Sequence, residues 1–295
     1  MQESITKIAV IGLGIMGAPI AIRLQNRFNC VHGYDPAQAA RDSATACGVF
    51  VAATVAECVT GADFVLTVLP TVDISRQVLE QFLEFGRSGA VLIEHGTIGS
   101  DAARRHARLA QEKGLKYLDA PVINGGQQAA QAGTLKILAG GDEQVVSCAE
   151  PVLRAYSTET LHMGPVGTAQ TMKLINNMLL AAISSASAEA LALAERAGIG
   201  AQRAYSVLSE SSTRSFALEW LFPAAVQGDF SGGAKIDILV KDMHLAMAEA
   251  SLYSARIPFT QLSSDLFEEC RSNGWGLQDM SIVLKLLSET PKQSS

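Results

Sequence analysis

The chain has 295 residues, 48% hydrophobic and 18% charged, enough apolar material for one large or two ordinary domains. A formal net charge of −6 argues against a general nucleic-acid binder, which would carry basic clusters. Five cysteines, an odd number without a CxxC pair, favour a reducing, cytoplasmic setting over a disulfide framework. The histidines form no metal-ligand motif and the N-terminus no targeting signal, so we expect neither a metal site nor export.

The first motif lies at the N-terminus. A short apolar run at residues 5–11 is typical of a buried parallel strand, and the GxGxxG sequence Gly12-Leu13-Gly14-Ile15-Met16-Gly17 follows it. A helix is expected at 18–26 and a second strand at 30–34. In this context the first glycine permits a tight turn, the second lets the backbone approach a pyrophosphate, and the third allows close helix–strand packing. The six motif residues are therefore predicted to bind a dinucleotide.

Asp35 ends the second predicted strand, 18 residues after Gly17. An acid at this place can bind both ribose hydroxyls, and it repels a 2′-phosphate. The expected cofactor is therefore NAD, with NADP disfavoured. A simple turn role for Asp35, ahead of Pro36, is the alternative.

The alternation of strands and helices continues. Strands are expected at 63–69, 90–94 and 115–119, and helices at 37–47, 72–85 and 100–113. This order predicts a doubly wound parallel sheet with helices on both faces, a Rossmann-type α/β domain. Because ligands bind at the carboxyl ends of such strands, Leu69, Pro70 and Thr97 are candidate cofactor contacts.

A glycine pair follows the next strand. The segment Asp119-Ala120-Pro121-Val122-Ile123-Asn124-Gly125-Gly126 leads into a small-residue helix, a turn at Gly133 and a strand at 136–139. Backbone N–H groups at paired glycines can bind an anion such as a carboxylate. An ordinary turn is the alternative.

The second half reads as all-helical. From about Gly164 the strand pattern stops, and helices are expected at 167–198, 201–209, 216–222, 236–254, 261–271 and 278–287. We therefore expect a NAD-binding domain at 1–163 and a helical domain at 164–295, joined by the long 167–198 helix. That helix contains serines and Glu189, so it does not fit a membrane span of about 20 nearly uncharged residues.

Lys173 and Asn177 are the notable polar residues of the long helix. They are four residues apart and share one face, beside Asn176. A lysine and an amide on an otherwise apolar helix are costly to bury unless they have partners or a function. A solvated surface lysine is the alternative.

Together these motifs resemble the β-hydroxyacid dehydrogenase family, which includes 3-hydroxyisobutyrate dehydrogenase, tartronate semialdehyde reductase and threonate dehydrogenase. The resemblance covers about residues 7–287. It rests on GLGIMGAPIA, DAPVINGG with AGTL, GTAQTMKLINN, and the late segment KDMHLA beginning at Lys241. Two segments depart from the family pattern: Ile123-Asn124 replaces a single serine, and Glu94-His95-Gly96-Thr97 replaces Asp-Met-Ser-Thr.

The resemblance implies roles for individual residues. Lys173 would be the general acid/base, and Asn177 would bind substrate and support the lysine. Lys241 would lie by the nicotinamide and close the site, and Thr97 would contact the cofactor. Substrate binding extends by the same resemblance to Asn124, Gly125 and Gly126. The family also implies a homodimer or homotetramer formed through the helical domain.

The expected function is NAD(P)-dependent hydride transfer at the hydroxyl carbon of a short 3-hydroxy acid. The partner is thus a small hydroxy acid or aldehyde acid, with no nucleic acid or membrane. Within the family, a threonate or sugar-acid dehydrogenase and a tartronate semialdehyde reductase are alternatives. Outside it are an imine reductase, in which the lysine position is typically another residue, a decarboxylating 6-phosphogluconate-type enzyme, and a non-catalytic dinucleotide-binding protein.

Overall fold

The computed structural model describes residues 5–123 and 125–289. The chain divides into two compact units, Met1–Lys173 and Leu174–Ser295. The division falls inside the long helix α8, Thr168–Arg196, ten residues after the boundary expected from the sequence. The structure places both units in the predicted classes: an α/β sheet unit followed by a helical unit.

The first unit is built on a nine-stranded sheet in its described part, ordered β3-β2-β1-β4-β5-β6-β8-β7 with β9 beside β8. The strands are β1 (Ile8–Ile11), β2 (Val31–Tyr34), β3 (Phe50–Val51), β4 (Phe64–Thr67), β5 (Val91–Glu94), β6 (Lys116–Asp119), β7 (Val122–Ile123), β8 (Leu135–Gly140) and β9 (Ser157–Gly164). The sheet is parallel from β3 to β6. The order reverses next to β1, which creates the switch point where doubly wound folds bind ligands.

The far end of the sheet differs from the all-parallel prediction, because β8 runs antiparallel to both β6 and β7. The connection from β7 to β8 is residues 124–134, and its described part holds the six-residue helix α6, Gln127–Ala132. A parallel pairing needs a crossover of about a dozen residues or more, so a short connection favours the antiparallel arrangement.

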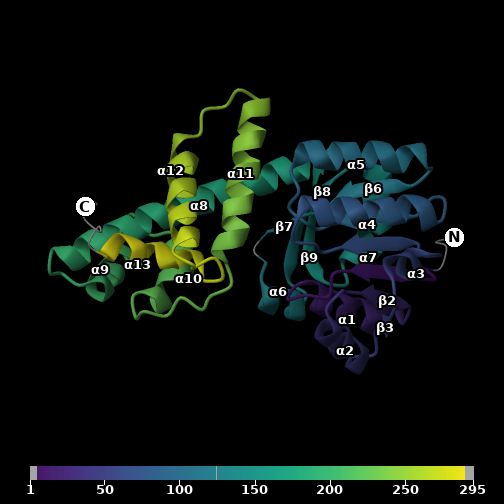
Figure 1. Cartoon of the computed structure of the whole chain (residues 1–295), viewed down its shortest axis with the longest axis horizontal. Coiled ribbons are helices and arrows are strands. Elements are labelled where there is room, and N and C mark those ends of the chain that lie inside the picture. Colours follow the sequence, from purple (N-terminus) through teal and green to yellow (C-terminus); the bar gives the residue numbers. More distant parts are fainter. Residues whose placement is uncertain (1–4, 124, 290–295) are drawn as a thin grey trace. The chain divides into compact units, whose positions relative to one another are not determined.

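Helices cover both faces of the sheet (Figure 1). They are α1 (Gly17–Phe28), α2 (Gln38–Ala46), α3 (Val55–Val59), α4 (Val72–Phe85), α5 (Ser100–Glu112) and α7 (Glu143–Leu153). Successive β1 residues point to opposite faces, so Ile8 and Val10 join one core cluster while Ala9 and Ile11 join the other. This double burial explains why β1 is wholly apolar and why β4 and β5 are apolar up to their last residues, Thr67 and Glu94.

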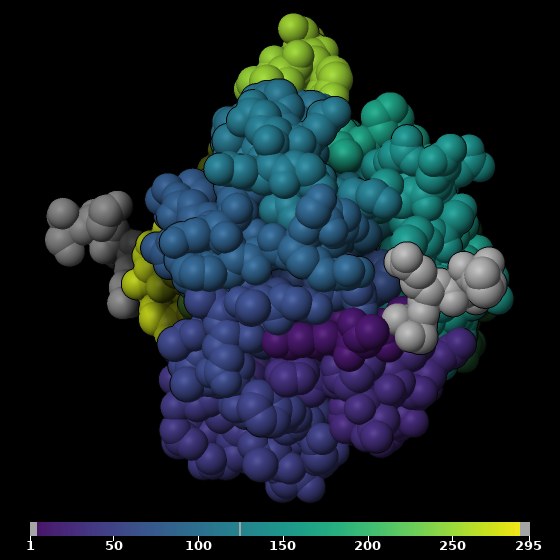
Figure 2. Space-filling model, turned by 90° about the vertical axis from the view of Figure 1, so that its right-hand side faces the viewer, coloured from purple at the N-terminus to yellow at the C-terminus, as the bar shows by residue number. Residues whose placement is uncertain are grey.

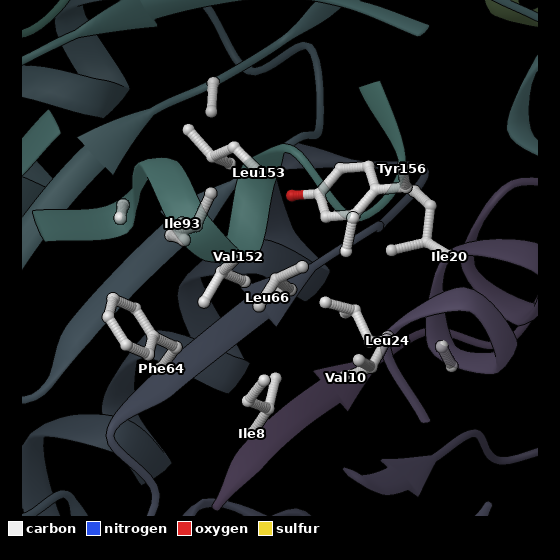
Figure 3. Packing of buried hydrophobic residues seen from close by; sticks show 14 of the residues in the cluster. Ile8, Val10, Ile20, Leu24, Phe64, Leu66, Ile93, Val152, Leu153 and Tyr156 are labelled. Carbon is white, nitrogen blue, oxygen red and sulfur yellow. The ribbon is translucent and has the colours of Figure 1, made fainter. Parts of the chain in front are cut away.

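The first of these clusters joins strands to α1 and α7. Ile8 and Val10 of β1 pack with Ile20 and Leu24 of α1, and Tyr156 lies beside them (Figure 3). Seen from the side, the purple N-terminal segments and the blue segments that follow them form a closely packed surface (Figure 2).

Four elements of the first unit are absent from the sequence prediction: β3, α3, α7 and β9. The first two are short, and β9 has a mixed pattern with its middle partly exposed. The start of α7 carried a usable signal, because Asp142 caps it by accepting hydrogen bonds from the backbone nitrogens of Gln144 and Val145.

The second unit contains the rest of α8 and α9 (Ala201–Leu208), α10 (Phe216–Ala225), α11 (Ile236–Leu252), α12 (Pro258–Ser272), η1 (Met280–Ile282) and α13 (Val283–Ser288). Its core gathers Phe222, Met243 and Phe267, and α11 lies alongside α12 (Figure 1). Helix α12 begins three residues earlier than expected, because Pro258 fits the first turn of a helix.

Within the described residues, α8 is the one helix long and apolar enough to cross a bilayer by length and composition. A core helix of a folded protein has the same features, and 44% of its most apolar stretch is buried. The hydroxyls of Ser184 and Ser187 in this helix donate hydrogen bonds to backbone carbonyls one turn earlier.

Candidate active site

The glycine loop after β1 is shaped by close backbone contacts. Gly12 has φ +93°, and a Cβ there would lie 2.4 Å from the Val68 carbonyl oxygen. A Cβ at Gly17 would lie 1.8 Å from the Gly12 oxygen. At Gly14, by contrast, no described atom would come within 4 Å of a Cβ. The first and third glycines are thus needed by the fold, whereas the second borders open space that a ligand can enter.

The loop leads into the N-terminus of α1. Ile15 is exposed, and Met16, the residue at the N-cap, makes no side-chain capping hydrogen bond within the described chain. The first turn of α1 also carries no acidic residue. Backbone N–H groups and the positive end of the helix dipole therefore favour an anion such as a pyrophosphate here.

Asp35 follows β2 and reaches back to the same loop. One of its carboxylate oxygens, Oδ2, accepts a hydrogen bond from the Leu13 backbone nitrogen at 2.8 Å, and the other accepts one from the Ala37 nitrogen at 2.8 Å. Each carboxylate oxygen has a second lone pair. The half-buried carboxylate can therefore accept ribose hydroxyls while it holds the glycine loop.

The segments that follow β4 and β5 lie beside the glycine loop. A Cβ at Gly12 would lie 3.3 Å from Leu69 Cδ2, and a Cβ at Gly96 would lie 3.1 Å from the Leu69 carbonyl oxygen. The structure thus brings together the segments after β1, β4 and β5, three neighbouring parallel strands. Pro70 and Thr97 are the next residues along the latter two segments, at the carboxyl edge of the sheet.

The predicted substrate loop lies against the glycine loop. A Cβ at Gly125 would lie 3.6 Å from Met16 Cε. Gly126, the N-cap residue before α6, has φ +112°, a backbone conformation that L side chains rarely adopt. Asn124, the third residue predicted to bind substrate, lies outside the described residues.

His95 is the first residue after β5 and is buried. Its Nδ1 lies 2.6 Å from the Ala120 carbonyl oxygen and its Nε2 lies 2.9 Å from the Tyr156 hydroxyl. Because a carbonyl only accepts, Nδ1 carries the proton and Nε2 accepts from the tyrosine. Burial lowers the pKa of His95 from 6.5 to about 4, so the ring is neutral at pH 7 and serves as a structural link.

Asp119 connects the sheet to the start of α8. Its fully buried carboxylate accepts hydrogen bonds from the backbone nitrogens of Gly167, at 2.9 Å, and Gln170, at 3.0 Å. Burial raises its pKa from 3.8 to about 6, and the backbone donors oppose that rise. The carboxylate therefore caps the helix that carries Lys173.

Lys173 is half-buried on α8, and Asn177 lies one turn later on the same helix. In the second unit, Asn177 Nδ2 donates to Asp242 Oδ2 at 2.7 Å, and Asn177 Oδ1 accepts from Asn176 Nδ2 at 3.0 Å. Asp242 also pairs with Lys241, whose Nζ lies 3.1 Å from Oδ1. Asn177 and Lys241 are thus joined through one buried carboxylate.

The sequence did not predict a role for three polar residues that contact these segments: Asp119, Gln170 and Asp242. The last two stand within the segments GTAQTMKLINN and KDMHLA, where a polar side chain interrupts an apolar helix. That interruption was an available signal, because a buried polar group needs a partner. All three are buried and hydrogen-bonded in the structure.

The chain is similar to known proteins over nearly its whole length. A sequence model of the NAD-binding domain of 6-phosphogluconate dehydrogenase matches residues 7–164. A second model, described as NAD-binding of NADP-dependent 3-hydroxyisobutyrate dehydrogenase, matches residues 167–287. The first match ends just before α8, and the second begins at its start.

Individual relatives agree with these models. The 2-(hydroxymethyl)glutarate dehydrogenase of Eubacterium barkeri is 33% identical over 290 residues, covering 97% of this chain and 96% of that protein. The NAD-dependent L-serine dehydrogenase of Pseudomonas aeruginosa is 34% identical over 300 residues, covering 97% and 99%. A solved structure of Mycobacterium tuberculosis 3-hydroxyisobutyrate dehydrogenase with L-serine has 34% identity and a TM-score of 0.89, covering 97% and 100%. With motifs, fold and relatives in agreement, the chain belongs to the β-hydroxyacid dehydrogenase family of nicotinamide-dependent oxidoreductases.

Proposed function

We propose that this enzyme uses NAD to oxidise the primary alcohol of a short 2-substituted 3-hydroxypropanoate to the corresponding 3-oxo acid. The substrates named by the relatives are 3-hydroxyisobutyrate, 2-(hydroxymethyl)glutarate and L-serine. All three are carboxylates with a CH₂OH group on the α-carbon. The shared unit, rather than any one compound, is what we carry over to this chain.

The observation that carries the proposal is the placement of Lys173 and Asn177. They stand one turn apart on α8, in a segment that matches the family's catalytic motif. In this proposal the neutral Lys173 amine accepts the hydroxyl proton of the alcohol during oxidation. In the reverse direction the Lys173 ammonium donates that proton to the carbonyl oxygen. Proton transfer by a positioned group contributes typically about 10²–10⁴-fold to the rate.

Asn177 can support this transfer without giving up its existing contacts. An amide NH₂ has two N–H groups and its carbonyl oxygen has two lone pairs. Asp242 and Asn176 each use one of these positions. With the contacts of the described residues counted, one N–H and one lone pair remain for the substrate hydroxyl or the Lys173 amine, and the buried Asp242 carboxylate keeps the amide in one orientation.

The first unit fits a dinucleotide. The open space at Gly14, the N-terminus of α1 and the Asp35 carboxylate supply a place for close backbone approach, anion binding and ribose binding. When bound, the nicotinamide accepts the hydride that the alcohol carbon loses. Leu69, Pro70 and Thr97 are assigned to cofactor contact, and Asp35 is the reason that we assign NAD rather than NADP.

The substrate carboxylate needs donors. We assign the backbone N–H groups at Gly125 and Gly126 to it, because paired glycines expose such groups and the loop lies against the glycine loop. Asn124 is retained in this assignment from its place in the motif. Lys241 is assigned to the substrate and nicotinamide, with Asp242 limiting its freedom.

We further propose a homodimer or homotetramer formed through the helical unit. Phe216 and Trp220 of α10 stack with ring centroids 5.8 Å apart, yet they are 68% and 48% exposed. Exposed aromatic pairs of this kind are typical of interfaces. Light scattering on the purified protein measures its oligomeric state, and a monomer at micromolar concentration contradicts the proposed homodimer or homotetramer.

The experiment that tests the function is a turnover assay with NAD and with NADP, following the absorbance of reduced nicotinamide. The panel contains 3-hydroxyisobutyrate, L-serine, 2-(hydroxymethyl)glutarate, threonate and glycerate at alkaline pH, where a lysine base is more often neutral. Turnover of the CH₂OH acids with NAD supports the proposal. Turnover of threonate alone moves the assignment to the sugar-acid branch. Glycerate carries the same CH₂OH unit as the other acids, so turnover of glycerate alone keeps the reaction and assigns the tartronate semialdehyde branch. Reduction of a cyclic imine, or cofactor binding without turnover of any acid, contradicts it.

A further inference from the structure

Both backbone polar groups of Gly96 are bound by buried side chains. Its N–H donates to Glu94 Oε1 at 2.8 Å, and its carbonyl oxygen accepts from Gln170 Nε2 at 2.8 Å. Glu94 and Gln170 both have 0% exposure. Glu94 ends β5, and Gln170 lies in the first turn of α8, so two elements distant in the sequence hold one glycine.

The amide oxygen of Gln170 binds the same loop. Its Oε1 accepts from the Ile98 backbone nitrogen at 2.9 Å and from the Gly99 nitrogen at 3.2 Å. One side chain therefore binds three backbone groups within residues 96–99. Buried backbone groups are costly to leave without partners, so removal of this amide leaves the loop with several unsatisfied positions.

Glu94 is itself anchored on the other side. Its second carboxylate oxygen, Oε2, accepts a hydrogen bond from the Ser75 hydroxyl of α4. The carboxylate therefore bridges α4 and the Gly96 N–H. A charge-assisted hydrogen bond of this kind is stronger than one between neutral groups.

The position of the Glu94 carboxylate explains the glycine at 96. A Cβ built at Gly96 would lie 2.6 Å from Glu94 Oε1, closer than real Cβ contacts allow. Both positions differ from the family's Asp-Met-Ser-Thr segment: glutamate replaces the shorter aspartate at 94, and glycine replaces serine at 96. In the structure the longer acid occupies the space in which a serine side chain at 96 would begin.

We infer that Glu94 and Gln170 are positioning residues that clamp the 96–99 loop, and that glycine at 96 is required because glutamate stands at 94. The loop carries Thr97, so the clamp sets the place of a cofactor contact. This last step rests on the proposed function, which assigns Thr97 to the cofactor. The clamp itself rests only on contacts within the first unit.

The first test is a double-mutant cycle with Gly96→Ser, Glu94→Asp and the two combined. Binding of NADH is measured by fluorescence titration and stability by Tm. Gly96→Ser is expected to lower Tm and to raise the Kd for NADH about tenfold or more, since tenfold corresponds to about 1.4 kcal/mol. The double variant is expected to recover to within about threefold of Glu94→Asp alone. Gly233→Ser is the control, because no described atom would lie within 4 Å of its Cβ.

The second test addresses Gln170. Gln170→Met keeps the length but removes the three hydrogen bonds of the side chain, whereas Gln170→Glu keeps an acceptor for Ile98 and Gly99 and loses the donor to Gly96. Hydrogen exchange of the Ile98 and Gly99 amides is expected to accelerate about tenfold or more in the methionine variant and less in the glutamate variant. KM for NAD is expected to rise more than kcat falls. Gln111→Met, at an exposed site on α5, is the control.

Different results would contradict the clamp, the requirement for glycine at 96 and the proposed function. Additive effects in the cycle overturn the requirement for glycine at 96, and unchanged exchange in Gln170→Met overturns the clamp. Exchange and Tm need no cofactor, so they test the clamp even if the chain binds no nicotinamide. A wild type with protected amides at 98 and 99 that binds no NADH overturns the proposed function and leaves the clamp standing. A wild type that binds NADH no better than Gly96→Ser, at equal Tm, overturns the requirement for glycine.

Discussion

The Asp35 carboxylate lies 2.8 Å from the backbone nitrogen of Leu13, the residue between the first two glycines of the GxGxxG loop. The contact joins the end of β2 to the turn after β1, strands that pair directly in the sheet. One carboxylate therefore fixes the glycine loop, and under the proposed function it also offers acceptors to the ribose.

Asp35→Asn tests the cofactor assignment. The amide oxygen can still accept from Leu13, but the negative charge that repels a 2′-phosphate is removed. We expect kcat/KM for NAD to fall about 10–100-fold, the value of a charged hydrogen bond of about 1.5–3 kcal/mol, while the NADP-to-NAD ratio rises. Steady-state kinetics with both cofactors measure this. Asp42→Asn, on the exposed face of α2, is the control, and an unchanged cofactor ratio contradicts the assignment.

The glycine loop allows a matched pair of substitutions. Gly17→Ala forces a Cβ to within 1.8 Å of the Gly12 oxygen, so we expect a large fall in Tm. Gly14→Ala meets no described atom within 4 Å, so the fold should tolerate it. Because its Cβ enters the space assigned to the pyrophosphate, the Kd for NADH should rise about tenfold or more. Normal NADH binding by Gly14→Ala contradicts the placement of the cofactor.

Lys173 is tested by two replacements that differ in charge. Lys173→Met removes the amine, and Lys173→Arg keeps a cation that does not deprotonate in proteins. Both should lower kcat by about a hundredfold or more, the usual contribution of a positioned acid or base, while the Kd for NADH stays within about threefold. Lys113→Met, at the exposed end of α5, is the control. Retained turnover in the arginine variant removes Lys173 from the proton-transfer role.

Acidification should weaken the fold through His95. Its pKa is about 4 in the folded protein against 6.5 for the free side chain, so below pH 6.5 the unfolded chain binds a proton that the folded chain excludes. This contribution to stability is complete above pH 6.5 and is lost as the pH falls to about 4. His106 acts in the same direction, because burial lowers its pKa to about 4 as well.

Asp119 acts in the opposite direction. Its pKa is raised from 3.8 to about 6, so its contribution to stability is present below pH 4 and is lost as the pH rises through 6. Urea unfolding at pH 7 and pH 4.5 separates the groups. His95→Asn should lose less stability on acidification than the wild type, by on the order of 2 kcal/mol, and Asp119→Asn should lose more. Equal losses in all three proteins contradict the pKa assignments.

The sequence predicts the sheet elements well where burial is complete. Helix α4 begins and ends at its predicted residues, and β1, β4 and β5 lie within their predicted runs. These elements have strong local signals, because strands buried on both faces are uniformly apolar and α4 is amphipathic with Thr71 as its N-cap. The two-residue β3 and the partly exposed β9 lack such signals, since their pairing depends on neighbours far along the chain.

The same distinction applies to the site. The sequence by itself determined the spacing of the residues predicted for the site, Gly12 to Gly17, Asp35, Lys173 and Asn177, because motif spacing and helical periodicity are local properties. Only the tertiary structure decided which buried groups hold them. Asp119 caps α8, Asp242 holds Asn177, and Glu94 with Gln170 holds Gly96 across distances of many residues. A buried carboxylate or amide gains its role from its hydrogen-bond partners, and folding alone brings those partners together.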